Sequence, residues 1–192
     1  IVLILYYVLP KRWQWGVLLI ASIFYYLCSG NAILILYPVL AVAVSFAGIY
    51  WLTKAQKEEA RLKERGKDAA KRRKAALLFV IFANVAVLFL LKYINFGIHT
   101  INAAAAFFGA GRDILSGFNW LVPLGISYYS LSLIGYVVDV YFGIAVPQKN
   151  PAKLALYGMF FPVMVSGPIL RYREDGEQFF EPHLFDYKQV TQ

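Results

Sequence analysis

Two histidines, His99 and His183, are the only imidazole side chains in this sequence of 192 residues. An imidazole titrates near neutral pH, so it can take the proton of an attacking hydroxyl group. Neither histidine lies inside an apolar segment. We therefore expect a solvated or interfacial role for His99 in a loop, and for His183 a structural role, with gating of a cytoplasmic entrance as the alternative.

The sequence contains no other motif of known chemistry. It has no Gly-x-Ser-x-Gly, no His-Glu-x-x-His, no phosphate-binding glycine loop and no Cys-x-x-Cys. Cys28 is the single cysteine and stands in an apolar run, which predicts a small buried thiol without a disulfide or metal. No bound metal and no bound cofactor are predicted.

The richest set of polar groups lies in residues 121–141, an apolar segment with one charged residue. At helical spacing one face carries five small or polar residues: Gly125, Tyr128, Ser132, Gly135 and Asp139. In a membrane such a face packs against other helices or lines a substrate cavity, because small residues let helices approach closely and hydroxyl groups bond across the interface. Both interpretations stay open. Asp139 is expected to form a structural ion pair near the cytoplasmic end, with Lys149, Arg171 or Arg173, rather than to act as a general base.

Residues 154–170 form an uncharged stretch that is interrupted by Pro162 and by the pair Gly167 and Pro168. As a continuous helix it would be only about 25 Å long, and proline removes a backbone donor from a helix interior. Broken apolar segments persist at membrane depth where protein or a watery cavity satisfies the freed backbone groups. A kinked or re-entrant element beside a functional channel is predicted, with Ser166 and Arg171 at its end.

The composition indicates a membrane protein, because 60% of the residues are hydrophobic and 17% are aromatic. Residues 13–53 carry no charge, and as one helix they would be about 60 Å long, twice the hydrocarbon core of a bilayer. Two antiparallel spans, 15–28 and 32–52, are predicted, with a turn at Ser29, Gly30 and Asn31. Residues 1–9 are interpreted as the remnant of a truncated helix.

Residues 53–74, in contrast to the uncharged stretch before them, carry ten basic and four acidic side chains. Short basic loops stay in the cytoplasm, so this loop, together with Lys11 and Arg12, is expected on the cytoplasmic side. A solvated helical hairpin or a helical extension is predicted, with Glu59 and Lys63 as a favourable pair. Contact with membrane lipid is a second possibility, whereas nucleic-acid binding is not expected, because the loop has no aromatic platform or recognition fold.

A further span is predicted over residues 75–91, followed by the interfacial anchors Lys92 and Tyr93. Residues 96–118 suit an extracytoplasmic loop or an interfacial helix, and 121–141 suits a full-length span. The sequence thus predicts an all-α, multi-pass membrane protein with about five spans and one broken segment. Its parts are residues 1–52, the basic loop 53–74, and residues 75–192 of the same membrane domain.

The region from residue 120 onwards resembles the membrane-bound O-acyltransferase (MBOAT) superfamily, in the bacterial branch that O-acetylates alginate and cell-wall polysaccharides and is related to teichoic acid D-alanyl transferases. The residues that carry the resemblance are Val122-Pro123-Leu124-Gly125-Ile126-Ser127-Tyr128-Tyr129, Gly135-Tyr136-Val137-Val138-Asp139-Val140-Tyr141, Phe160-Phe161-Pro162, Ser166-Gly167-Pro168-Ile169 and Arg171-Tyr172-Arg173. Weaker similarity continues upstream, at Lys92-Tyr93-Ile94-Asn95-Phe96, and downstream, at His183-Leu184-Phe185-Asp186.

This resemblance implies a funnel of helices in the inner membrane with a narrow tunnel. In this family an acyl group passes from a cytoplasmic thioester donor (acetyl-CoA or an acyl carrier) to an extracytoplasmic polysaccharide presented by a partner acyltransferase. The sequence is more similar to the relatives that transfer acetyl groups, so acetyl transfer is expected. The family's catalytic histidine matches neither histidine of this chain and is expected downstream of Gln192, so the fragment alone should be inactive. The candidates for the tunnel lining are Tyr128, Ser132, Asp139, Ser166 and Arg171.

Two other classes of function remain open from the residues themselves. A transporter or flippase also uses broken helices and polar stripes, and would show a second, matching broken segment. A non-catalytic assembly subunit would show neither that repeat nor an intramembrane histidine.

Overall fold

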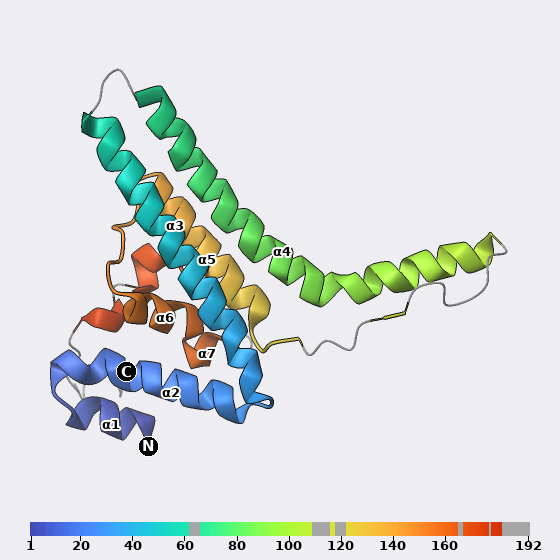
Figure 1. Ribbon diagram of the computed structural model, residues 1–192. Helices are drawn as coiled ribbons and strands as arrows, with labels where there is room; N and C mark the ends of the chain where they lie inside the picture. The colour runs from blue at the N-terminus through green and yellow to red at the C-terminus, as the bar shows by residue number, and fades with distance from the viewer. Residues whose placement is uncertain (62–65, 109–115, 118–121, 165–166, 177, 182–192) are drawn as a thin grey trace.

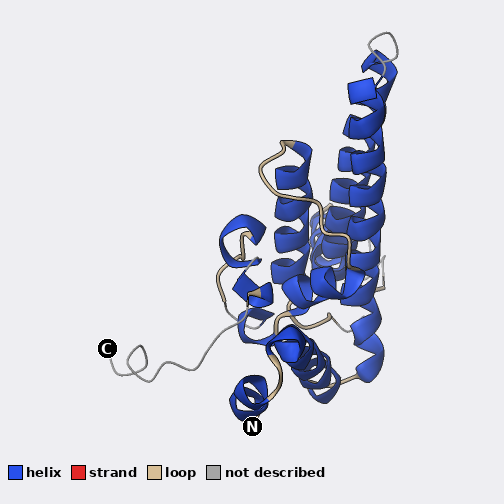
Figure 2. Ribbon diagram, turned by 90° about the vertical axis from the view of Figure 1, so that its left-hand side faces the viewer, coloured by secondary structure: helices blue, strands red, loops and turns tan. Residues whose placement is uncertain are grey.

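The computed structural model describes residues 1–192 except 62–65, 109–115, 118–121, 165–166, 177 and 182–192 (Figure 1). The described residues form helices and connecting loops, with no strand among them (Figure 2). The helices are α1 (Val2–Val8), α2 (Gln14–Cys28), α3 (Leu36–Arg61), α4 (Gly66–Phe107), α5 (Ile126–Tyr141), α6 (Pro151–Met159) and α7 (Phe161–Met164). Short turns of helix lie at Lys11–Trp13, Ala32–Ile35, Tyr172–Gly176 and Gln178–Phe180. The all-α prediction is confirmed for this part of the chain.

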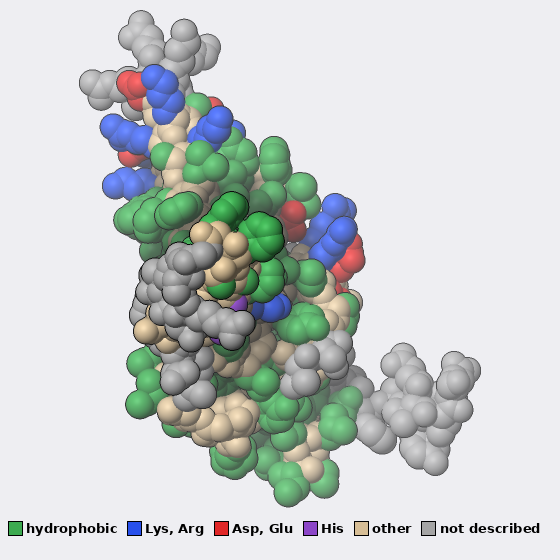
Figure 3. All heavy atoms as spheres, turned by 90° about the vertical axis from the view of Figure 1, so that its right-hand side faces the viewer, with side chains coloured by type: hydrophobic (Ala, Val, Ile, Leu, Met, Phe, Trp, Pro, Cys, Tyr) green, Lys and Arg blue, Asp and Glu red, His purple; other side chains and the backbone are tan. Residues whose placement is uncertain are grey.

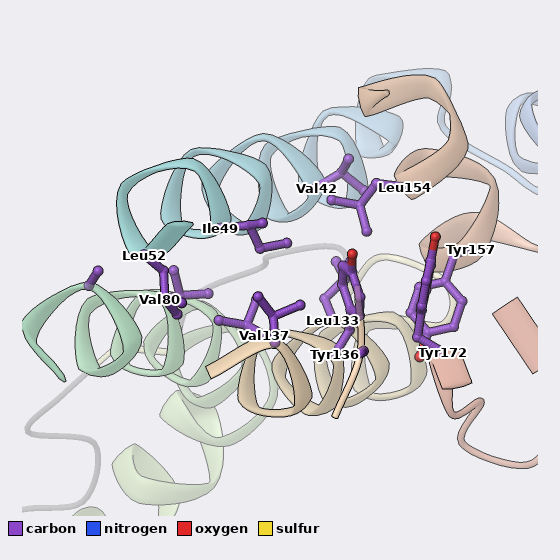
Figure 4. Packing of buried hydrophobic residues seen from close by; sticks show 13 residues of the cluster. Val42, Ile49, Leu52, Val80, Leu133, Tyr136, Val137, Leu154, Tyr157 and Tyr172 are labelled. Atoms are coloured by element: carbon purple, nitrogen blue, oxygen red, sulfur yellow. The ribbon is translucent and has the colours of Figure 1, made fainter. Parts of the chain in front are cut away.

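Helices α3, α4 and α5 run up, down and up beside one another and form the centre of the molecule (Figure 1). Their facing sides supply a core that includes Ile49, Leu52, Val80, Leu133 and Val137 (Figure 4). At Gly48 of α3 the Val80 side chain of α4 comes so close that an added Cβ would overlap it. A small residue therefore sets the distance between the two longest helices, as is usual for packing in membranes.

Two segments are long and apolar enough to cross a membrane: Ala32–Arg61, with a hydropathy of 2.4, and Ala70–Phe107, with a hydropathy of 2.5. Only 28% and 22% of their most apolar windows are buried, so most of their apolar surface faces outwards, unlike the core helix of a soluble protein. The expected number of five spans is not reached in the described chain. Helix α2 has 15 residues and α5 has 16, which is about 22 to 24 Å of helix.

Of the two spans predicted before residue 53, the second lies in Ala32–Arg61, which is long and apolar enough to cross a membrane, but α2 does not run antiparallel to it as predicted. The chain does turn at Gly30, which has a φ of 149°, and Asn31 accepts a hydrogen bond from the Ile33 amide. However, α2 then lies across the end of the bundle opposite the hairpin between α3 and α4, and it packs on α6 and α7 (Figure 1). Lys11 and Arg12, which join α1 to α2, therefore lie away from the hairpin, not on its side. Cys28, expected to be buried, is exposed at the end of α2.

The basic region forms the predicted helical hairpin between the end of α3 and the start of α4. Two ion pairs connect its arms: Arg72 Nη1 lies 3.5 Å from Glu58 Oε2, and Arg73 Nη1 lies 3.2 Å from Glu59 Oε2. Glu59 thus pairs across the hairpin, whereas Lys63, its predicted partner, lies outside the described residues. Opposite charges on the two helices thus face each other across the hairpin.

Helix α4 does not end near residue 91 as predicted. It continues to Phe107, and its C-terminal part bends away from the bundle (Figure 1). Of the two interpretations for residues 96–118, the helix is therefore correct up to Phe107, and His99 lies exposed on this helix rather than in a loop. Leu121, the expected start of the next span, lies outside the described residues, and α5 itself begins only at Ile126.

Candidate functional site

The predicted break in residues 154–170 is confirmed. Helix α6 ends at Met159, Phe160 takes an extended conformation with φ −61° and ψ 111°, and α7 covers only Phe161–Met164. Pro162 has no backbone N–H to continue the ladder of α6, but it fits the first turn of a new helix. The freed Phe161 amide donates instead to Ser22 Oγ of α2, at 3.2 Å. A side chain from a distant helix thus satisfies the broken backbone, as low-dielectric surroundings require.

Gly125 directly precedes α5 and lies against Met164, at the end of α7. It has a φ of 72°, a conformation that favours glycine. A Cβ at this position would lie 2.5 Å from Met164 Cγ and 2.8 Å from the Met164 carbonyl oxygen. Two requirements, the left-handed backbone and the close approach of α7, therefore select glycine here.

Two of the predicted tunnel residues, Tyr128 and Ser132, lie together beside the break. They line a small cavity with residues of α5, α6, α7 and the segment that follows: Tyr129, Tyr157, Gly158, Phe160, Val163, Met164 and Leu170. The Tyr157 hydroxyl closes this region by donating to the Leu170 carbonyl at 2.7 Å, and it lies 3.3 Å from the Ser132 carbonyl. The cavity measures about 10 Å³, which is room for one water at most.

A larger pocket of about 140 Å³ lies between α3, α4 and α5, and most of its lining is apolar. Its polar lining groups are those of Tyr37, Asn84, Tyr129 and Ser130. The Tyr129 side chain is 3% exposed, and its hydroxyl has no hydrogen-bond partner within the described chain. Because an unpaired hydroxyl in an apolar interior is costly, this group is placed to receive a water or a polar ligand.

Sequence reasoning passed over Tyr129, Ser130 and Asn84. The polar face predicted for α5 passes through Tyr128 and Gly135. In the structure, the face of α5 that packs inwards passes through Tyr129, Leu133 and Tyr136. Gly135 is exposed and has no atom within 4 Å of an added Cβ. Asn84, a lone amide in an apolar run of α4, was a signal that could have found this pocket.

Three tyrosines hold the far end of α6 to α5. The ring of Tyr136 lies 4.0 Å from that of Tyr172, and the ring of Tyr157 lies 5.0 Å from that of Tyr172 (Figure 4). The Tyr136 hydroxyl accepts from the Gln148 amide at 2.6 Å and donates to the Val146 carbonyl at 2.9 Å. Gln148 Nε2 in turn donates to the Tyr172 hydroxyl at 2.9 Å. This network fixes the loop between α5 and α6 against the segment after the break.

The remaining predicted site residues are not brought together. Asp139 lies near the C-terminal end of α5 and forms none of the expected ion pairs within the described residues, while its backbone carbonyl accepts from the Ile144 amide at 2.8 Å. Arg171 is exposed and lies 3.7 Å from Glu174 instead. Ser166 and His183 lie outside the described residues. The described residues contain no group of three or more potential metal ligands.

The chain is similar to proteins named probable alginate O-acetylase AlgI. It is 31% identical to that of Pseudomonas aeruginosa over 182 residues, which cover 91% of this chain and 31% of the relative. The chain is a relative of the alginate O-acetylases. It is also 37% identical to that of Pseudomonas syringae pv. tomato and 36% identical to that of Pseudomonas putida, each over 103 residues and 54% of this chain. No family model and no solved structure matches.

The resemblance first seen in residues 120–192 is therefore confirmed, and the longest match extends it over most of the chain. The chain spans about a third of the length of its Pseudomonas aeruginosa relative and 20% of the one from Pseudomonas syringae.

Proposed function

We propose that the gene product containing this chain is a membrane O-acyltransferase that transfers acetyl groups to an extracytoplasmic polysaccharide. The observation that carries this proposal is the similarity to alginate O-acetylases along 91% of the chain. The two apolar helices long enough to cross a membrane support it, because the transfer has to connect two compartments. The protein is proposed to lie in the inner membrane as a multi-pass protein.

In the proposed reaction a hydroxyl oxygen of the polysaccharide attacks the carbonyl carbon of an acyl thioester. The new C–O bond forms, the C–S bond breaks, and the proton of the hydroxyl group ends on the leaving thiol. A histidine beyond Gln192 is proposed to carry that proton, since an imidazole can accept and return it near neutral pH. This chain alone is expected to be inactive.

The role proposed for this chain is to form one wall of the acyl passage. The break between α6 and α7, with Tyr128 and Ser132 beside it, supports this role, because irregular backbone at membrane depth needs polar neighbours. The 10 Å³ cavity is too small for a substrate, so the passage is proposed to open towards residues outside this chain. The unpaired Tyr129 hydroxyl is the best placed donor for a passing carbonyl group.

The charge of the hairpin supports a proposed direction of transfer. Among the described side chains, the hairpin between α3 and α4 carries more basic than acidic groups, and the positive-inside rule favours its placement in the cytoplasm. The thioester donor, acetyl-CoA or an acyl carrier, would then arrive from the hairpin side. The acceptor polysaccharide, presented by a partner acyltransferase, would lie on the side of α2.

The decisive experiment expresses the complete gene in an alginate-producing bacterium that lacks its own O-acetylase. Acetyl esters on the secreted alginate, measured by proton NMR, should return, and alanine in place of the histidine beyond Gln192 should abolish them while the protein remains in the membrane. D-Alanyl esters on teichoic acid in a matching Gram-positive host would assign the alternative acyl group. Secretion of the polysaccharide without any ester, in a strain blocked in export, would favour a transporter instead.

A further inference from the structure

An open groove lies between α3 and α4 at the base of the hairpin. Its volume is about 440 Å³, within the range of small-molecule sites. One side is formed by α3 and the other by α4, with residues that recur at helical spacing: Trp51, Lys54, Ala55 and Glu58 opposite Arg72, Ala75, Ala76 and Phe79. The site described above uses none of these residues.

The other side of the same helix pair is closed. There α5 covers the hairpin base: the Arg73 guanidinium lies 4.7 Å from the centre of the Tyr141 ring, and Gln56 Nε2 lies 3.4 Å from the Val140 carbonyl oxygen. On the groove side Trp51 is 53% exposed and Phe79 is 52% exposed, with their rings 6.1 Å apart. Two large aromatic side chains thus lie exposed on the side of the hairpin base that α5 does not cover.

The groove spans the border between charged and uncharged sequence. In α3 the residues before Lys54 carry no charge. In α4 the residues after Lys74 carry no charge as far as Leu91. Lys and Arg side chains therefore gather at the hairpin end, with hydrophobic side chains directly below them (Figure 3). Tryptophan beside basic residues at such a border is typical of the interface between the headgroups and the hydrocarbon of a bilayer.

The charges in the groove favour an anion. Lys54 and Arg72 face a single carboxylate, Glu58, and the Arg72–Glu58 pair is 3.5 Å long with side chains 73% and 39% exposed. An exposed pair of this kind contributes little and exchanges easily. A guanidinium can bind two phosphate oxygens at once, and the single Arg72 Nη1 contact with Glu58 leaves other donors of Arg72 for such a group.

We propose that this groove binds an anionic phospholipid. Its phosphate group would contact Lys54 and Arg72, and the first part of an acyl chain would lie on Ala55, Ala76 and Phe79. The inference does not depend on acetyl transfer, because it requires only that α3 and α4 lie in a bilayer with the hairpin at one surface. The bound lipid would cover the apolar side of the α3–α4 pair that α5 leaves open.

The test compares two double variants of the complete protein in neutral nanodiscs by titrating phosphatidylglycerol and counting bound lipids by native mass spectrometry. The groove variant, K54Q with R72Q, should lose at least about tenfold in apparent affinity, because each basic group near a membrane surface contributes about 1 kcal/mol. The control, K57Q with K71Q, removes the same charge from exposed positions outside the groove and should change affinity by less than about threefold.

A third variant, A75W, tests the groove without changing its charge. Ala75 is exposed and lines the groove, so a tryptophan there should displace the lipid while the melting temperature stays unchanged. Equal losses in the two double variants, or full binding by A75W, would overturn the proposal. So would displacement of the lipid by inorganic phosphate or by coenzyme A at micromolar concentration, since the site would then belong to a soluble anion. None of these outcomes bears on acetyl transfer, which is measured separately.

Discussion

Helix α5 is held in different ways at its two ends. At its start, beside the break, no charged side chain lines the small cavity, and Gly125 fits against the Met164 backbone. At its other end Val140 lies in the apolar core, and polar and cationic contacts are added to it: Arg73 lies over Tyr141, and Gln56 reaches the Val140 carbonyl. Close packing of side chains stabilises the end of α5 from which water is excluded, and charged side chains add contacts at the end that water can reach. Substitutions at the first end should therefore cost more than substitutions at the second.

The largest effect is expected for Gly125→Val. Valine would meet the Met164 backbone and would need a φ of 72°, so we expect destabilisation by about 3 to 5 kcal/mol or failure to fold. The matched control is Gly135→Val, which adds the same side chain in the same helix where no atom lies within 4 Å of the Cβ. Its stability should change by about 0.5 kcal/mol or less within the described contacts.

Thermal denaturation of the complete protein in detergent measures both variants. A Gly125→Val protein that melts like the wild type would show that α7 does not pack on this turn. A large loss in Gly135→Val would show that the Gly135 face is covered by a segment outside the described chain, and would decide between the two interpretations of the polar stripe.

A smaller effect is expected for Tyr157→Phe at the same end of α5. The hydroxyl donates to the half-buried Leu170 carbonyl at 2.7 Å, and its loss leaves that acceptor without this partner, at a cost of about 1 kcal/mol. Tyr129→Phe removes a hydroxyl that has no partner in the described chain, so it should leave stability unchanged or raise it slightly.

The pair also separates structure from function. In the complete protein, a Tyr129→Phe variant with unchanged melting and at least about tenfold slower acetyl transfer would support contact between this hydroxyl and a substrate. Unchanged transfer would remove Tyr129 from the proposed passage. A Tyr129→Phe variant that melts earlier would mean that the hydroxyl has a structural partner.

Features that depend on neighbouring residues could be predicted from the sequence, whereas the packing of helices on distant partners could not. The break at Pro162, the turn at Gly30 and the basic hairpin depend on local chemistry, and all three were predicted. The course of α2 was not, because an uncharged run of apolar residues does not reveal whether a helix crosses a membrane or lies across its neighbours. Likewise, Tyr129 could not be distinguished from Tyr128, because periodicity gives the faces of a helix but not their partners.

At the hairpin end, Arg73→Gln should cost about 1 kcal/mol, because it removes a half-buried ion pair together with the contact between the guanidinium and the Tyr141 ring. Arg72→Gln removes an exposed pair and should cost less than about 0.5 kcal/mol. Melting in low and high salt checks both, since only the exposed pair should lose its small contribution fully in 1 M salt. Equal costs would contradict the difference between the two faces of the hairpin.

The smallest effect is expected for Asp139→Asn. The sequence predicted an ion pair for this carboxylate, but within the described chain it forms none, and the Asp139 backbone carbonyl that accepts from Ile144 is unchanged by the substitution. Stability should therefore stay within about 0.5 kcal/mol of the wild type. A double-mutant cycle with Lys149→Gln measures any hidden coupling, and a coupling above about 1 kcal/mol would restore the ion pair. If stability holds while acetyl transfer falls, Asp139 acts on the reaction from the hairpin side, where a soluble donor would enter.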